Sequence, residues 1–137
     1  MRNKHILLID DDIDERIIFQ DIIDSLTTDC LFSYAESADD AKEQLKWVIP
    51  DVIFLDHNMP RKNGLAFLSE IRKSELYSNV PVIFYSTGLT PELSQQAMDA
   101  GATICIKKYS NLQEFQKLMQ RIINESYLLK GNSNSLQ

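Results

Sequence analysis

The sequence predicts an α/β protein with a parallel β-sheet covered by helices on both faces. Two observations predict this class. Short apolar runs alternate with segments of helical periodicity along the chain, which is typical of parallel sheets. The strongest runs are apolar at every position, as strands buried on both faces are. The clearest run extends from Val52 to Leu55 and stops abruptly at Asp56.

The first half of the chain contains three expected strands and two expected helices. The run from Ile6 to Ile9 precedes three aspartates, and isoleucines then recur at helical spacing. Ser37 is a favourable N-cap for the second helix, and Pro50 helps to end it. We expect strands at 6–9, 30–35 and 52–56, a helix at about 14–25, and a helix from about 38 with Ala38, Ala41, Leu45 and Val48 on its buried face.

The second half alternates in the same way and finishes with a helix. Pro81 opens an apolar run that stops at Ser86, and Thr90 followed by a proline is a favourable helix start. Gly101 is a suitable C-cap, and Asn111 can cap the final helix. We expect strands at 82–85 and 103–106, helices at about 65–76 and 91–100, and a final helix that buries Leu112, Phe115, Leu118, Met119, Ile122 and Ile123.

Length and composition indicate one domain. The 137 residues are expected to form a domain at 1–130 and a polar, disordered tail at 131–137. The net charge of −6 argues against nucleic-acid binding through a basic surface. No apolar run approaches the roughly 20 residues of a membrane-spanning helix, so no membrane contact is expected. The first run is also too short for a signal peptide, and a cytoplasmic location is the default expectation.

Five strands of this kind commonly adopt the flavodoxin-like, doubly wound order 2-1-3-4-5, with five helices, and we adopt that order. The ends of the first and third strands are then neighbours, which brings Asp10 and Asp11 beside Asp56. Ser86 ends the fourth strand on the other side of Asp56, and Lys108 follows the fifth strand. Ligand sites in such sheets lie outside the carboxyl ends of the strands, so these residues define the candidate site.

Three carboxylates at one rim repel each other unless a cation offsets their charge. Oxygen ligands suit Mg²⁺, and the three aspartates with the backbone carbonyl of Asn58 make such a site. A carboxylate beside a metal ion can act as a nucleophile toward phosphorus, and Asp56 is the candidate nucleophile. Lys108 as a cation and Ser86 as a hydroxyl donor can hold the remaining phosphoryl oxygens.

With these motifs the chain resembles the response-regulator receiver domain, the phosphoryl-accepting half of two-component signalling, and in particular a single-domain chemotaxis regulator. The resemblance covers about residues 4–129 and rests on four motifs in order: Leu-Ile-Asp-Asp-Asp, Leu-Asp-His-Asn-Met-Pro followed by Gly64, Pro-Val-Ile-Phe-Tyr-Ser, and Gly-Ala-Thr-Ile-Cys-Ile-Lys-Lys. The resemblance implies Asp56 as phosphoacceptor, Asp10 and Asp11 as the acidic pair that binds Mg²⁺, Ser86 as the switch hydroxyl, and Lys108 as the family lysine.

The chain departs from the family pattern at two positions. Tyr109 follows the lysine where the family usually has proline, and we expect the peptide bond before it to be trans. Cys105 stands where the family often has an aromatic residue that turns inward on activation, so we expect switching to pass through the loop from Thr87 to Thr90. Cys105 and Cys30 fall on opposite sheet edges, too far apart for a disulfide, and both are expected to be free thiols.

Several of these residues also have plainer interpretations. Thr87 is an alternative to Ser86 as the switch hydroxyl. Side chains alternate along a strand, so at most one of Lys107 and Lys108 reaches the site. His57 lies next to the candidate acceptor, but a lone histidine is more often structural or solvent-facing than catalytic.

The leading functional hypothesis is a phosphorylation switch without turnover of its own. It accepts a phosphoryl group from a sensor histidine kinase or a phosphotransfer protein and signals through an unknown downstream protein. A Mg²⁺-dependent aspartyl-phosphate phosphatase of the haloacid-dehalogenase kind is an alternative, but it uses an acid where Asn58 stands. A flavin-binding flavodoxin needs an anion site where the chain has aspartates at 10–12. A module that keeps the fold without being phosphorylated is the remaining alternative.

Overall fold

The described residues of the computed structural model, 4–26, 29–108 and 111–124, form five strands and five helices that alternate along the chain. The strands are β1 (Lys4–Ile9), β2 (Cys30–Ala35), β3 (Val52–Asp56), β4 (Val82–Ser86) and β5 (Ile104–Lys107). The helices are α1 (Ile13–Ser25), α2 (Ala38–Leu45), α3 (Gly64–Arg72), α4 (Pro91–Ala100) and α5 (Leu112–Asn124). The predicted tail at 131–137 lies outside the described residues.

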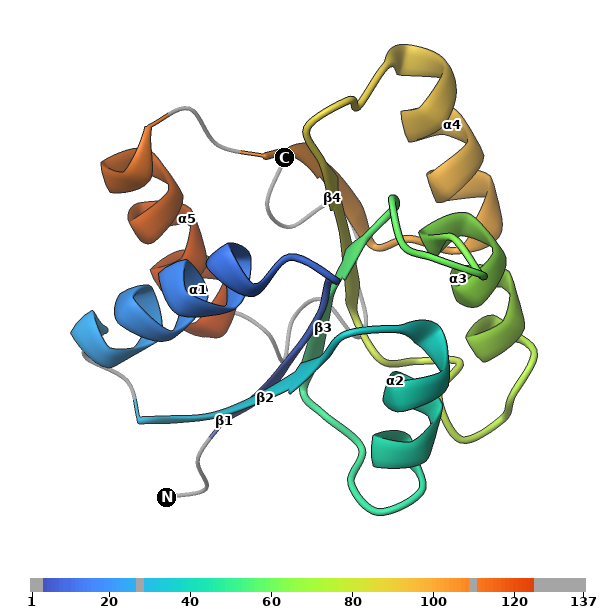
Figure 1. Ribbon diagram of the computed structural model, residues 1–137, viewed down its shortest axis with the longest axis horizontal. Coiled ribbons are helices and arrows are strands. Elements are labelled where there is room, and N and C mark those ends of the chain that lie inside the picture. Colours follow the sequence, from blue (N-terminus) through green and yellow to red (C-terminus); the bar gives the residue numbers. More distant parts are fainter. Residues whose placement is uncertain (1–3, 27–28, 109–110, 125–137) are drawn as a thin grey trace.

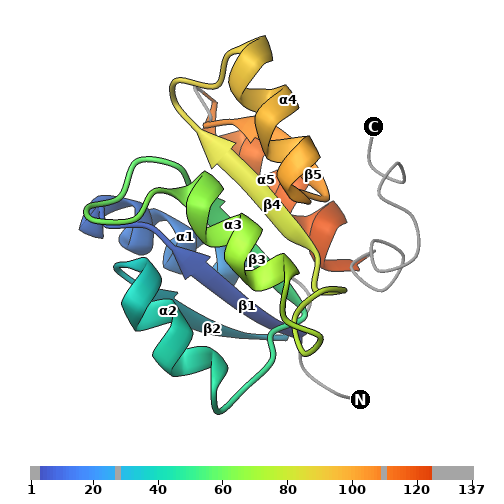
Figure 2. The same ribbon diagram turned by 90° about the vertical axis from the view of Figure 1, so that its right-hand side faces the viewer.

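All neighbouring strands are parallel, and their order is β2-β1-β3-β4-β5. Helices α1 and α5 cover one face of this sheet, and α2, α3 and α4 cover the other (Figure 1). The second face is seen from its helix side in Figure 2. The predicted flavodoxin-like, doubly wound sheet with five helices is therefore confirmed.

The sheet separates two apolar cores, and alternate residues of each strand point into one or the other. On β3, Leu55 belongs to the core beneath α2, α3 and α4, whereas Phe54 belongs to the core beneath α1 and α5. Phe19 of α1 lies at the centre of the second core, with its ring 5.3 Å from that of Phe54 and 5.5 Å from that of Phe115. Because both of their faces are buried, β3 and β4 are continuous apolar runs up to their last residue.

The predicted helix caps are present in the structure. The Ser37 hydroxyl accepts a hydrogen bond from the backbone N–H of Asp40 at 3.1 Å, and the Thr90 hydroxyl accepts one from Leu93 at 3.1 Å. Gly101 ends α4 with a φ of 113°, a left-handed conformation that glycine adopts without strain. These capping residues set the first and last residues of the helices, and thereby limit the segments that remain for the strands.

Two predicted helices are shorter than expected. Helix α2 ends at Leu45, so Val48 falls beyond it and is 48% exposed rather than buried. Helix α3 ends at Arg72 instead of continuing to residue 76, and Leu76 is 68% exposed. The Arg72 guanidinium donates hydrogen bonds to the carbonyl oxygens of Gly101 and Tyr77 at 2.9 and 3.0 Å, contacts that tie the turn after α3 to the end of α4.

Smaller differences occur near the carboxyl end. Strand β5 is shifted by one residue from the prediction and runs from Ile104 to Lys107. Leu112 begins α5 but is exposed rather than buried, because the first residue of the helix lies beyond the core. Cys30 and Cys105 are free thiols on the two edge strands, as predicted. No described helix is long and apolar enough to cross a membrane.

Candidate functional site

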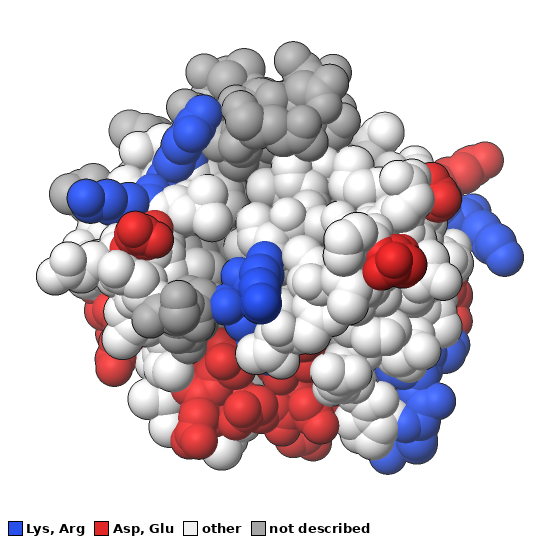
Figure 3. All heavy atoms as spheres, turned by 90° about the horizontal axis from the view of Figure 1, so that it is seen from above, with Lys and Arg blue, Asp and Glu red and all other residues white. Residues whose placement is uncertain are grey.

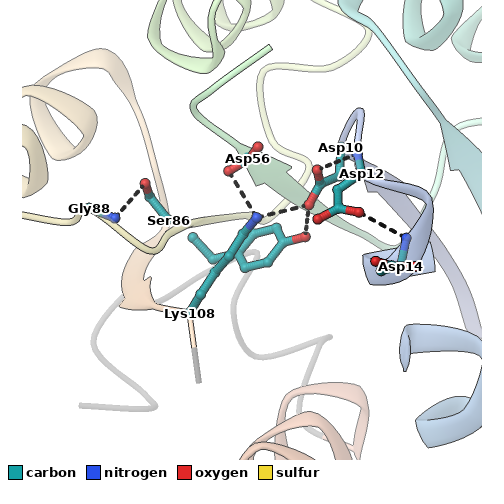
Figure 4. Close-up of polar contacts among 8 residues, drawn as sticks. Asp10, Asp12, Asp14, Asp56, Ser86, Gly88 and Lys108 are labelled. Atoms are coloured by element: carbon teal, nitrogen blue, oxygen red, sulfur yellow. Dashed lines mark hydrogen bonds and ion pairs between the residues drawn. The ribbon is translucent and has the colours of Figure 1, made fainter. Parts of the chain in front are cut away.

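Polar side chains gather where the strands end at one end of the sheet. Asp10 follows β1, Asp56 and Ser86 are the last residues of β3 and β4, and Lys108 follows β5. Figure 4 shows the Lys108 side chain extending toward both Asp10 and Asp56. Acidic side chains also form a patch on the end of the molecule that is uppermost in Figure 1 (Figure 3). The strand order thus brings together residues that are far apart in the sequence.

Asp10, Asp11 and Asp56 form a cluster of carboxylates. One carboxylate oxygen from each lies within 4.8 Å of the others. Asp10 is fully buried and Asp56 is 3% exposed, whereas Asp11 is exposed. Asp11 is therefore the member of the cluster that solvent reaches most freely.

Lys108 connects the two buried carboxylates. Its Nζ lies 3.1 Å from Asp10 Oδ2 and 3.4 Å from Asp56 Oδ1, and its side chain is 9% exposed. Burial alone lowers the pKa of Lys108, but Asp10 and Asp56 more than offset this, so the pKa is raised and the amine stays charged. Lys107 is exposed, as alternation along the strand requires once Lys108 faces the cluster.

The carboxyl of Asp56 has an unusually high pKa. Burial is the main cause, the negative charge of Asp10 adds to it, and Lys108 opposes both, which together raise the pKa of Asp56 to about 6. The raised pKa means that Lys108 does not fully offset the cost of burial and of repulsion from Asp10, but a pKa of about 6 still lies below neutral pH. Asp56 therefore remains ionised at neutral pH, although at a substantial cost in free energy.

Tyr85 is a further member of the cluster, although the sequence predicts it only as part of an apolar strand. Its hydroxyl donates a hydrogen bond to Asp10 Oδ2 at 2.6 Å, and Lys108 Nζ lies 4.9 Å from the centre of its ring. Burial and, next, the Asp10 carboxylate raise the pKa of Tyr85 far above its usual range, so the hydroxyl keeps its proton. The available signal was weak: a buried tyrosine needs a partner for its hydroxyl, but an apolar run does not show which residue supplies it.

The residues on the other side of Asp56 are less connected. Ser86 is fully buried, and its hydroxyl accepts a hydrogen bond from the backbone N–H of Gly88 at 3.3 Å (Figure 4). Thr87, the alternative hydroxyl, is exposed. Asn58, expected to offer its backbone carbonyl to a metal ion, is an exposed residue of the loop after β3. Tyr109 and the peptide bond before it lie outside the described residues.

The loop after β3 folds back closely on Asp56. The backbone N–H of Gly64 donates to the carbonyl oxygen of His57 at 2.9 Å, and a Cβ atom at position 64 would lie 2.3 Å from the carbonyl oxygen of Asp56. Only glycine fits this approach. The His57 ring lies 5.7 Å from that of Phe84, and burial lowers the pKa of His57. Its Nδ1 is buried without a hydrogen-bond partner among the described residues.

The donor set of this site fits a hard divalent cation. Three carboxylates offer oxygen atoms at mutual distances suited to one ion, and the donor set holds no sulfur or nitrogen atom. Mg²⁺ and Mn²⁺ prefer such oxygen ligands. The raised pKa of Asp56 has the same implication, since a cation would offset the repulsion between Asp56 and Asp10.

Comparisons with known proteins agree with this architecture. A protein-glutamate methylesterase/protein-glutamine glutaminase of Sulfurimonas denitrificans is 32% identical over 126 residues, which cover 85% of this chain and 35% of that protein. This chain thus spans about a third of the length of such curated relatives. The phosphorylated cyanobacterial phytochrome response regulator RcpA superposes with a TM-score of 0.82 at 24% identity, covering 93% of this chain and 95% of that one.

A chemotaxis response regulator of Vibrio cholerae, CheY4, is also similar, with a TM-score of 0.77 and 26% identity over 88% of this chain and 99% of that chain. The family model described as the response regulator receiver domain matches residues 6–120, which is most of the chain and includes every strand end discussed above. The chain belongs to the response regulator receiver domain family.

Proposed function

We propose that this chain is a phosphorylation switch that accepts a phosphoryl group on Asp56. One observation carries the proposal: Asp56 lies at the end of a buried strand, 3.4 Å from Lys108 and within 4.8 Å of two further carboxylates. Membership of the receiver family supports the same reading. An ionised, buried carboxylate beside a lysine cation is suited to attack phosphorus.

In the transfer, an Asp56 carboxylate oxygen forms a bond to phosphorus as the bond between phosphorus and the donor breaks. The donor keeps the electron pair of the broken bond, so acetyl phosphate leaves as acetate and a phosphohistidine leaves as free histidine. Lys108 contributes a positive charge that can turn from Asp10 toward a phosphoryl oxygen. Ser86 offers a hydroxyl donor on the opposite side of Asp56, once it turns away from Gly88.

Asp10, Asp11, Asp56 and the backbone carbonyl of Asn58 are the residues we assign to a Mg²⁺ ion. When bound, such an ion neutralises the phosphoryl oxygens and the crowded carboxylates. Asp10 is already oriented for this role, because its Oδ1 accepts a hydrogen bond from the backbone N–H of Asp12 at 3.0 Å. Asp11 lies on the exposed side, where an ion can enter.

The partner that donates the phosphoryl group is, in this proposal, a sensor histidine kinase or a phosphotransfer protein. The output is a change in contacts with another protein rather than turnover of a substrate, and the site of action is the cytoplasm. A methylesterase name on a longer relative describes that protein as a whole, and this chain matches about a third of it.

The test is intact-mass analysis after incubation with Mg²⁺ and acetyl phosphate. The expected result is one added phosphoryl group in the wild type, none with a chelator, and none in Asp56→Asn. Asp51→Asn is a matched control. Asp51 is also buried and lies directly before the same strand, where its Oδ2 accepts a hydrogen bond from the backbone of His5 at 2.7 Å. Phosphorylation of Asp56→Asn, or its loss in Asp51→Asn alone, would contradict the assignment.

A further inference from the structure

The hydrogen bonds around Asp10 differ in how firmly their donors are held. Its Oδ1 accepts from the backbone of Asp12 at 3.0 Å. Its Oδ2 accepts from Lys108 Nζ at 3.1 Å and from the Tyr85 hydroxyl at 2.6 Å. A fully buried carboxylate oxygen is costly when its donors are removed, so the persistence of each donor matters.

Lys108 is the donor that is shared. Its Nζ lies between Asp10 and Asp56, and in the proposed function it turns toward the group carried by Asp56. A cation that enters the cluster also repels the lysine. Each event weakens the contact between Lys108 and Asp10 Oδ2.

Tyr85 is the donor that cannot move. Its side chain is fully buried, with its ring 5.6 Å from that of Phe19 and 6.3 Å from that of Phe54. This packing in the core beneath α1 and α5 fixes the ring, and with it the direction of the hydroxyl. The hydroxyl therefore stays on Asp10 Oδ2 whatever Lys108 does.

We propose that Tyr85 is a positioning residue of the acidic site: it holds Asp10 in its cation-binding orientation and keeps Oδ2 paired when Lys108 turns away. The inference rests on the proposed function for the movement of Lys108. It goes beyond that function by assigning a residue of the apolar strand to the binding of the divalent ion.

The test compares Mn²⁺ binding to wild type and Tyr85→Phe, measured by the paramagnetic resonance of free Mn²⁺ without any phosphodonor. Phenylalanine keeps the ring in the core and removes only the hydroxyl. We expect Mn²⁺ to bind about tenfold more weakly, because Asp10 is no longer held in its cation-binding orientation before the ion enters, and ordering it then opposes binding. The Mg²⁺ concentration for half-maximal phosphorylation should rise by a similar factor, while the rate at saturating Mg²⁺ stays within about twofold.

Tyr77→Phe is the matched control. Its hydroxyl also donates a hydrogen bond, to the carbonyl oxygen of Leu45 at 2.9 Å, but it is remote from the carboxylates. The control should lose some stability and keep its affinity for Mn²⁺. In the wild type, a slowly exchanging hydroxyl proton on Tyr85 should be visible by NMR and persist when Mg²⁺ is added, a readout that needs no variant.

Three results would overturn the inference: affinity unchanged in Tyr85→Phe, affinity increased in Tyr85→Phe, or no Mn²⁺ binding to the wild type. Loss of the protected hydroxyl proton on adding Mg²⁺ would also overturn it. A wild type that binds Mn²⁺ but is never phosphorylated would contradict the proposed function while leaving the role of Tyr85 intact. If the wild type is phosphorylated and the Tyr85→Phe variant has normal Mn²⁺ affinity, the role of Tyr85 is contradicted and the proposed function stands.

Discussion

The two sides of Asp56 differ in how fully their contacts are made. On one side Lys108 forms ion pairs with both Asp56 and Asp10. The Tyr85 hydroxyl donates a hydrogen bond to Asp10, and the Tyr85 ring lies against the Lys108 amine. On the other side Ser86 is turned to the backbone of Gly88, and the loop beyond it is exposed. We call the side with Lys108, Asp10 and Tyr85 the connected side, because its charges are already paired. We call the side with Ser86 and the loop after it the open side, because the Ser86 hydroxyl is hydrogen-bonded to Gly88 rather than to Asp56.

This difference predicts that the free energy of unfolding and the response to phosphorylation depend on different residues. Changes on the connected side should alter the free energy of unfolding, because they disturb buried charges. Changes on the open side should leave stability almost unchanged and affect only how the molecule responds to a group on Asp56. The following variants test that division.

Lys108→Ala should have the largest effect. It leaves Asp10 and Asp56 buried without their shared cation, and removal of one partner of a buried ion pair costs about 3–5 kcal/mol. Urea unfolding in the presence of a chelator measures this loss. Lys107→Ala, an exposed residue, should change stability by less than about 0.5 kcal/mol. Lys108→Ala should also lose phosphorylation-dependent switching, and equal behaviour of the two variants would contradict the connected network.

Asp56→Asn should stabilise the metal-free protein. The folded-state pKa of Asp56 is about 6, above its ordinary 3.8, so the folded state holds the proton more tightly than the unfolded state. Stability therefore falls as pH rises from about 4 to about 6, and above that range the ionised group costs about 3 kcal/mol.

Urea unfolding across this pH range, with a chelator, should show the decline in wild type and a flatter profile in Asp56→Asn. Added Mg²⁺ should restore stability to the wild type at neutral pH and have a smaller effect on the variant. A variant less stable than wild type at neutral pH would show that the contact of Asp56 with Lys108 outweighs burial and repulsion from Asp10.

The sequence predicted the connected side only in part. Asp56 was predictable because an apolar run ended at it. Alternation along the strand showed only that at most one of Lys107 and Lys108 reaches the site, and the family motif after Gly101 selected Lys108. The role of Tyr85 was missed, since a tyrosine in an apolar run reads equally well as core. Its contact with Asp10 depends on the distance between β1 and β4, which are separated by β3 in the sheet. Periodicity along one segment carries no information on such a contact.

Most of the fold was also predictable from local patterns in the sequence. The main errors in the prediction lay at the ends of helices. The strands and most helix limits followed from apolar runs and caps, whereas the strand order was adopted as the common arrangement of five such strands. The end of α3 was not predicted. The Arg72 side chain there donates to the carbonyl oxygen of Gly101, a contact over 29 residues that no local pattern shows. Val48 was placed on a helix face that ends at Leu45.

Ser86→Ala should separate response from stability on the open side. The lost hydrogen bond is long, and water can pair with the exposed Gly88 amide, so the cost should be below about 1 kcal/mol. With Mg²⁺ and beryllofluoride, wild type should show large amide shifts at residues 86–93, and the variant should show much smaller ones. Thr87→Ala should respond like wild type. If Thr87→Ala loses the response and Ser86→Ala keeps it, the alternative hydroxyl is the functional one.

Cys105→Ala should have the smallest effect. The thiol is partly buried, and it donates a weak hydrogen bond to the carbonyl oxygen of Ser94 on α4, at 3.6 Å. Where the receiver family often has an aromatic residue, a cysteine displaces too little volume on turning to remodel a surface. The thiol is thus a poor relay between Asp56 and the face formed by α4, β5 and α5.

The loop from Thr87 to Thr90 is better suited to that relay. Gly88 is exposed, and a Cβ atom there would meet no other atom within 4 Å, so the loop has room to move with Ser86. A group on Asp56 that binds Ser86 more strongly than Gly88 does would pull this loop and the start of α4. Beryllofluoride should therefore shift the amides at 86–93 in Cys105→Ala as strongly as in wild type. Loss of those shifts, with phosphorylation intact, would place the relay at the Cys105 contact with Ser94 and make β5 part of the responding side.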